Sequence, residues 1–203
     1  MKTILSISAA IALSLASAGI QAQGWIVGGA IGQSKQQDYD VGGPIATRDD
    51  VDTAARIVGG YMTSRRHGVI ASYIDLGAGR YDGPALGGFE DTLEAEGIDV
   101  SYLISWPPGS QERISLFGLI GVFIWDQDVS FSDASGDFLY RDEGTSFSFG
   151  VGTSINLQAD GMSRWNVHAE WQVFKDVGDD RNSGHEEDRD AFTVGIAYRF
   201  GGE

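Results

Sequence analysis

The sequence contains no cysteine and only 4 prolines among its 203 residues. Without cysteine the chain can form no disulfide, no thiolate metal site and no cysteine nucleophile. Basic residues are also scarce, since 14 Lys and Arg stand against 29 Asp and Glu and give a net charge of −15. Proteins that bind nucleic acid contact its phosphates through clustered Lys and Arg side chains, so we expect no nucleic-acid partner.

Long apolar runs are missing after the N-terminus. The longest, residues 116–125, is about half of the ~20 residues that a membrane-spanning helix needs. At the N-terminus itself, Lys2 is followed by an apolar run over residues 4–18, and the small residue Ala22 precedes Gln23. This pattern predicts a secretory signal peptide over residues 1–22, cleaved after Ala22 or after Ala18. The mature chain, residues 23–203, is then exported from the cytoplasm.

What the sequence does contain is alternation of apolar residues with polar or small ones. At the C-terminal end, Phe192 and every second residue to Phe200 are apolar, whereas Thr193, Gly195 and Arg199 lie on the opposite face. A period of two residues predicts a strand with one apolar face. The pattern predicts eight strands, over residues 25–33, 56–62, 67–77, 98–106, 113–125, 147–156, 165–173 and 192–200. Residues 113–125 are apolar on both faces, so their orientation stays open.

The connections between these strands alternate in length. Residues 63–66, 107–112 and 158–164 are short connections, whereas 34–55, 78–96, 126–144 and 176–190 are long and hold 23 of the 29 acidic residues. Strands of this length, joined by short turns at one end and long loops at the other, are typical of outer-membrane barrels. We therefore predict an all-β fold, an eight-stranded antiparallel up-and-down transmembrane β-barrel over residues 23–203, with periplasmic turns and long acidic extracellular loops.

Aromatic residues lie near the ends of the predicted strands. Such positions suit the girdle of aromatic side chains at a membrane interface. An alternative is the core of a soluble β-protein, which the export signal and the nearly charge-free apolar face disfavour. We predict the following interface aromatics: Trp25, Tyr61, Tyr73, Trp106, Trp125 and Trp165.

Polar residues on the opposite strand face would point into the barrel. An eight-stranded barrel is narrow and nearly filled by side chains, and a charge inside it needs a partner. We therefore predict that Glu170 pairs with Arg56 or His168, either as a satisfied polar core or as a gate on a narrow ion path. The predicted lumen cluster is Arg56, Asp99, His168, Glu170, Gln172 and Arg199.

Residues suited to catalysis or to metal binding are few and scattered. His67 falls in a short turn, His168 within a strand and His185 in the last long connection, so we expect no enzyme. Residues 179–184 are similar to part of a calcium-binding loop, but the spacing does not complete the motif. We expect no cofactor and no dedicated metal site, and weak binding of divalent cations by the acidic loops stays open.

Five segments resemble the OmpA-like outer-membrane β-barrel family, in the order that the family has them. They are GWIVGGAIGQS at 24–34, VGGY at 58–61, SYIDLG at 72–77, HAEWQ at 168–172 and VGIAYRF at 194–200. The resemblance implies a monomer in a Gram-negative outer membrane, in contact with lipid and lipopolysaccharide and delivered by periplasmic chaperones. It also implies that the closing strand carries the signal read by the barrel-insertion machinery, on Val194, Ile196, Tyr198 and Phe200.

The function that follows is structural and surface-exposed. The protein would support membrane integrity, adhesion or contact with a surface ligand through its acidic loops. The alternative is a small porin-like channel that passes ions or small solutes.

Overall fold

The computed structural model describes residues 24–37, 47–64, 66–83, 89–106, 113–133, 136–157, 165–179 and 185–200. The expected signal peptide and its two candidate cleavage sites lie outside the described residues. Within the described ranges, no helix has the length and hydropathy that crossing a membrane requires.

Nine strands account for nearly all of these residues, and one of them, β2, is only three residues long. The strands are β1 (Gly24–Gln37), β2 (Thr47–Asp49), β3 (Val51–Met62), β4 (His67–Gly83), β5 (Phe89–Trp106), β6 (Ile114–Asp133), β7 (Gly136–Asn156), β8 (Trp165–Asp179) and β9 (His185–Phe200).

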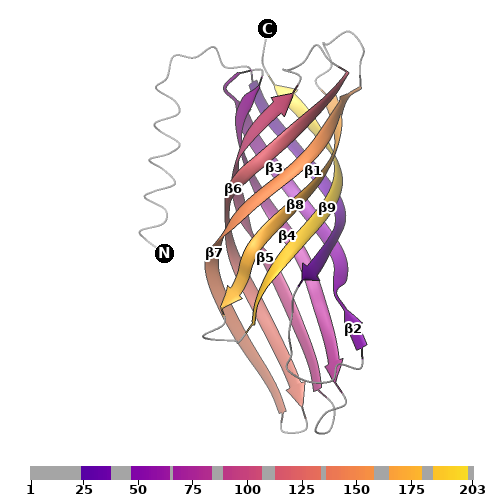
Figure 1. The fold of residues 1–203 in the computed structure, drawn as a ribbon, viewed down its shortest axis with the longest axis vertical. Helices are drawn as coiled ribbons and strands as arrows, with labels where there is room; N and C mark the ends of the chain where they lie inside the picture. Colours follow the sequence, from indigo (N-terminus) through magenta and orange to yellow (C-terminus); the bar gives the residue numbers. More distant parts are fainter. Residues whose placement is uncertain are drawn as a thin grey trace.

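The eight long strands form a closed antiparallel barrel (Figure 1). Each pairs with its neighbours along the chain, and β1 pairs with β9 from Trp25↔Phe200 onwards, which closes the sheet. The short β2 pairs with β4 outside this circuit. Closure pairs the backbone groups of every strand within the sheet, which a structure surrounded by hydrocarbon requires. The predicted fold class is confirmed.

Side chains alternate between a buried lumen and an exposed apolar wall. On β3, Ala54, Arg56 and Val58 are buried, whereas Ile57 between them is 67% exposed. Exposed apolar patches of this extent are foreign to soluble monomers and match the lipid-facing band of a membrane barrel. The band includes Trp25, Val27, Ile31, Ile98, Val100, Tyr102, Ile104, Trp106, Leu116, Ile120, Phe147, Val151, Trp165, Val194, Ile196 and Phe200.

The strands run well beyond this apolar band. In the four ranges expected to be loops, every described residue except Asp50 is in a strand. Strand β7 has 21 residues, which at ~3.3 Å per residue and a tilt of ~40° spans about 50 Å along the barrel axis, against an apolar band of ~25 Å. The loop boundaries are therefore corrected: backbone pairing continues where the lipid no longer dictates which residues must be apolar.

The extension is confined to one end and to one side of the barrel. In Figure 1, β4 to β7 reach lower than β8 and β9 and form a projecting sheet. We call this the projecting end. The opposite end, where Trp25 pairs with Phe200, is the termini end.

Two β-bulges mark the level at which the closed barrel wall gives way to the projecting sheet. The register shifts on β4 between Asp75 and Ala78 and on β8 between Phe174 and Val177. Each bulge contains one residue in the left-handed region, Gly77 with φ of 67° and Asp176 with φ of 53°. A bulge adds a residue to one strand and increases its local bend. The ladder between β7 and β8 ends at this level, at Ser148↔Phe174.

An apolar layer fills the lumen near these bulges. Its side chains are at most 4% exposed, and the rings of Phe123 and Phe174 lie 4.6 Å apart. Trp125, expected at the membrane interface, belongs to this layer and donates from Nε1 to Ser146 Oγ at 2.7 Å. That prediction was wrong because odd-numbered positions of β6 point inward, which its two apolar faces did not reveal.

Candidate functional site in the barrel lumen

A buried ionic cluster joins three strands across the lumen. Arg56 on β3 contacts Glu170 on β8, and its Nη2 lies 3.7 Å from Asp99 Oδ2 on β5. Arg56 Nη1 also donates to Gln172 Oε1 at 3.0 Å. These side chains are at most 8% exposed, so each charge is removed from water and held by partners instead. We call this group the ionic cluster.

Hydroxyl groups complete the contacts of the buried carboxylate. Ser101 donates to Asp99 Oδ2 at 2.7 Å, and Ser148 donates to Asp99 Oδ1. A buried charge is tolerated only when ion pairing and hydrogen bonds replace its lost hydration. Asp99 thus receives two hydroxyl donors and one guanidinium, which fits its complete burial.

Of the six polar residues predicted for the lumen, four lie in this cluster. His168 and Arg199 are only half-buried and line a cavity on the termini side of the ionic cluster. Sequence reasoning left Arg56 and His168 as alternative partners of Glu170, and the structure places Arg56 in contact with it. Among the described residues, the Arg199 guanidinium has no ion pair, and its buried Nε has no hydrogen-bond partner.

The cavity has a volume of about 130 Å³ and two chemically different walls. The strands β1 and β3 to β6 supply most of the apolar side chains: Ile26, Val58, Met62, Ile70, Leu103, Phe117 and Leu119. The strands β7 to β9 supply most of the polar ones: Ser154, Asn156, Asn166, His168, Glu170 and Arg199.

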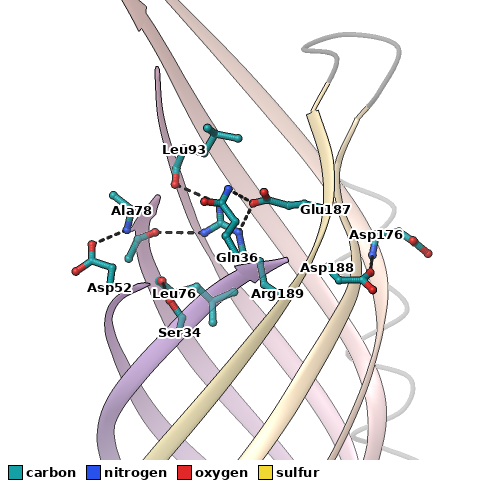
Figure 2. A network of polar contacts seen from close by, with 11 residues as sticks. Ser34, Gln36, Asp52, Leu76, Ala78, Leu93, Asp176, Glu187, Asp188 and Arg189 are labelled. Carbon is teal, nitrogen blue, oxygen red and sulfur yellow. Dashed lines mark hydrogen bonds and ion pairs between the residues drawn. The ribbon is translucent and has the colours of Figure 1, made fainter. Parts of the chain in front are cut away.

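A second buried polar network lies at the projecting end of the lumen (Figure 2). Arg189 on β9 donates from Nε to Glu187 Oε1 at 2.7 Å and from Nη2 to the Leu93 carbonyl at 3.1 Å. Its Nη1 reaches the carbonyl of Gly77, in the β4 bulge, at 3.3 Å. Gln36 on β1 also donates to Glu187. This network joins β1, β4, β5 and β9 at the level of the two bulges, where the closed wall gives way to the projecting sheet.

Sequence reasoning missed this second network because its side chains, Gln36, Glu187 and Arg189, fall in ranges that we expected to be loops. A signal was nevertheless present. Glu187, Arg189, Ala191 and Thr193 continue the inward alternation of the closing strand. Inward-facing charges of opposite sign two residues apart on one strand would have indicated a lumen pair.

The outer surface of the projecting sheet is acidic. Six neighbouring carboxylates near the bulge of β4 are among those that point outward from it: Asp75, Glu94, Glu96, Asp126, Asp128 and Glu143. We call this surface the acidic face. Glu96 pairs in register with Asp126, which pairs with Glu143. Five of the six, with Arg141, line a hollow of about 170 Å³.

Like charges placed directly opposite on neighbouring strands destabilise a sheet. Within the acidic face, little offsets the repulsion between these carboxylates. Arg141 approaches Asp126 and Asp128 at 3.6 and 3.8 Å, and it is 64% exposed. Tyr73 donates its hydroxyl to Glu96.

The predicted interface aromatics other than Trp125 point outward. The Trp25 and Tyr61 rings lie 4.9 Å apart, and Trp165 lies 4.8 Å from Tyr198. Val194, Ile196, Tyr198 and Phe200 share the outward face of β9. Their reading by the insertion machinery stays a prediction.

A closed barrel with an apolar outer band and a polar, partly charged lumen defines an outer-membrane β-barrel protein. The family model of the OmpA-like transmembrane domain matches residues 20–203. The chain belongs to this family, and the protein resides in the cell outer membrane.

The sequence relatives carry one name. Outer membrane protein A of Yersinia pseudotuberculosis is 25% identical over 210 residues, covering 100% of this chain and 56% of that protein. Its counterpart in Shigella flexneri is 24% identical over 203 residues, covering 98% of this chain and 56% of that protein. The chain thus spans about half the length of the curated relatives it matches.

Solved structures with the same fold are small outer-membrane barrels. The attachment invasion locus protein Ail of Yersinia pestis has a TM-score of 0.53 at 16% identity, covering 88% of this chain and 99% of Ail. Neisserial surface protein A has a TM-score of 0.57 at 14% identity, covering 88% and 99%. A further structure of Ail, with a TM-score of 0.50, 16% identity and coverage of 87% and 97%, contains the heparin analogue sucrose octasulfate.

Proposed function

We propose that this protein is a structural outer-membrane barrel that presents the acidic face to the exterior, where it contacts basic surface ligands. The observation that carries the proposal is the acidic face itself. Six carboxylates gather on one outer surface of the projecting sheet, at the cost of placing Glu96, Asp126 and Glu143 in register. A charge arrangement that weakens its own sheet is better explained by contact with a partner than by stability.

The proposed orientation places the termini end in the periplasm and the projecting end outside. At the termini end the strands stop close to the apolar band, whereas at the projecting end they continue beyond it, as the larger extracellular part of a bacterial barrel does. The projecting sheet stands beyond the apolar band and therefore beyond the hydrocarbon. In this orientation Trp25, Tyr61 and Trp165 lie at the periplasmic interface, whereas Tyr73 lies at the level of the acidic face, where it donates to Glu96.

Charge determines which ligand fits. A cluster of carboxylates attracts cationic ligands and speeds their association, and salt screens the attraction. The fold neighbour Ail has been crystallised with a sulfated heparin analogue, but the acidic face would repel such a polyanion. We infer a basic partner here, such as a Lys- or Arg-rich protein segment.

The channel alternative fits the lumen poorly. In the described part of the barrel, the ionic cluster and the Arg189 network are separated by the apolar layer around Phe123 and Phe174. These side chains fill a narrow lumen as a packed core does. Hydrated ions would have to displace the rings to pass.

The test uses the purified protein in nanodiscs of zwitterionic lipid, so that lipopolysaccharide contributes no charge. We expect a fluorescent oligolysine to bind the wild type and to bind the variant E94Q/E96Q/D126N/D128N at least about tenfold more weakly. The matched control, E94D/E96D/D126E/D128E, keeps every charge and should bind like the wild type. Equal affinity for the neutralised variant, or preferential binding of heparin by the wild type, would contradict the proposal.

A further inference from the structure

The cavity at the termini end has the size and chemistry of a ligand site. Its volume is about 130 Å³, close to the ~150 Å³ of an apolar engineered cavity that accepts benzene. A six-membered ring or a chain of five to six carbons is therefore the largest body that it holds without rearrangement.

The two walls require an amphiphilic occupant. Phe117, Leu119 and Ile70 present apolar surface from one side, whereas Asn166, His168 and Arg199 present polar groups from the other. Water alone would satisfy only the polar wall. An apolar body with one polar end satisfies both.

Arg199 determines the charge of that polar end. Arg56, the other lumen cation lining this cavity, has two carboxylates beside it. Arg199 has no carboxylate partner among the described residues, and its Nε is buried without a hydrogen bond. A partly desolvated cation without a partner is costly, and a planar guanidinium binds a carboxylate through two parallel hydrogen bonds.

Glu170 limits the charge of the occupant. It lines the same cavity, so a dianion such as phosphate would meet a negative charge as well as a positive one. A monoanion at Arg199 avoids this conflict while its apolar body lies against the far wall.

We propose that this cavity binds a small amphiphilic monocarboxylate of benzoate size, with the carboxylate on Arg199 and the apolar body against Phe117 and Leu119. The site lies on the termini side of the ionic cluster, so its occupant enters from the termini end. It is separate from the acidic face, and neither proposal depends on the other.

The experiment measures binding of 4-fluorobenzoate by ¹⁹F NMR to the folded protein in zwitterionic nanodiscs, with empty nanodiscs subtracted. We expect saturable binding of the carboxylate, at least about tenfold weaker binding of the neutral 4-fluorobenzamide, and none of 4-fluorobenzylammonium. The size of this loss is that of a charged hydrogen-bonded pair. Absence of saturable carboxylate binding, or equal binding of the three ligands, overturns the proposal.

Two variants locate the site. Arg199→Gln should weaken carboxylate binding at least about tenfold, and Arg199→Lys should recover part of it. The matched control, Arg141→Gln, removes a cation from the outer surface and should leave binding unchanged. Because Arg199→Gln could affect folding, Val58→Phe serves as a second variant that fills the cavity and keeps the charge. Unchanged binding in a folded Arg199→Gln or Val58→Phe protein overturns the assignment.

Discussion

The ionic cluster offers the sharpest test of how this lumen is held together. Replacing Arg56 by Met keeps a long side chain but removes the positive charge that pairs with both Asp99 and Glu170. The Arg56 and Asp99 side chains are 3% and 0% exposed, so water cannot replace the lost partner. Breaking a buried pair by removing one member costs about 3–5 kcal/mol, which is a factor of roughly 10²–10³ or more in the unfolding equilibrium.

Neutralising all three charges should behave differently. In Arg56→Met/Asp99→Asn/Glu170→Gln no unpaired charge remains, and Ser101 and Ser148 can still bond the new amide, because a hydroxyl both donates and accepts. Replacing a whole buried ionic group by neutral side chains is often close to neutral in stability. We expect the triple variant to recover most of the loss, to within about 1–2 kcal/mol of the wild type.

The assay is urea unfolding in phospholipid vesicles, followed by tryptophan fluorescence and by the gel mobility of unheated samples. The matched control is Arg141→Met, which removes an arginine whose two ion pairs are exposed and should cost at most about 1 kcal/mol. If Arg56→Met unfolds like Arg141→Met, or if the triple variant is less stable than the single one, the reasoning about buried charge is refuted.

Three further outcomes follow from the wall and the lumen. In the same unfolding assay, Ile120→Lys in the apolar band should lower the free energy of unfolding by about 2–4 kcal/mol. Ser130→Lys, on the same outward face of β6 but beyond the band, should lower it by less than about 0.5 kcal/mol. Equal losses would show that the apolar band does not lie where we place it. Gly77→Ala should lower the urea midpoint of unfolding, because φ is 67° and a Cβ would lie 2.7 Å from the Thr53 carbonyl. The control Gly59→Ala places a Cβ where nothing lies within 4 Å, so its midpoint should stay unchanged. Removing both rings of the apolar layer, Phe123→Ala/Phe174→Ala, should raise single-channel conductance in planar bilayers above that of the wild type; unchanged conductance would show that the layer is not the barrier.

The barrel itself was predictable because lipid imposes a strict rule on sequence. Every outward residue within the hydrocarbon must be apolar, so alternation persists in Ile98, Val100 and Tyr102 and in the closing strand. Antiparallel neighbours and closure then follow, since an open edge in lipid would leave backbone groups unpaired.

The projecting sheet was not predictable by the same rule. Outside the hydrocarbon, a strand can carry Glu94 and Glu96 outward without penalty from lipid, so apolar alternation ends although backbone pairing continues. The orientation of strand β6 was not predictable for the opposite reason. Its inward residues Phe123 and Trp125 fill the lumen with apolar side chains, so its two faces look alike in the sequence. The lumen residues of β3, β5 and β8 could be named, but their contacts depend on the shear of the barrel, which the sequence does not display.

The Arg189 network explains how a barrel can carry a sheet on one side only. At the level of the two bulges the wall loses the ladder between β7 and β8, and β4 bends at Gly77. Arg189 donates to backbone carbonyls on β4 and β5 and to Glu187 on its own strand, so it joins the closing strand to the strands that continue into the projecting sheet. The β8 bulge is held in turn by Ser146, which donates to the Asp176 carbonyl at 2.7 Å. Buried side chains thus replace the missing backbone ladder where the circular wall ends, and the acidic face keeps a fixed position relative to the membrane.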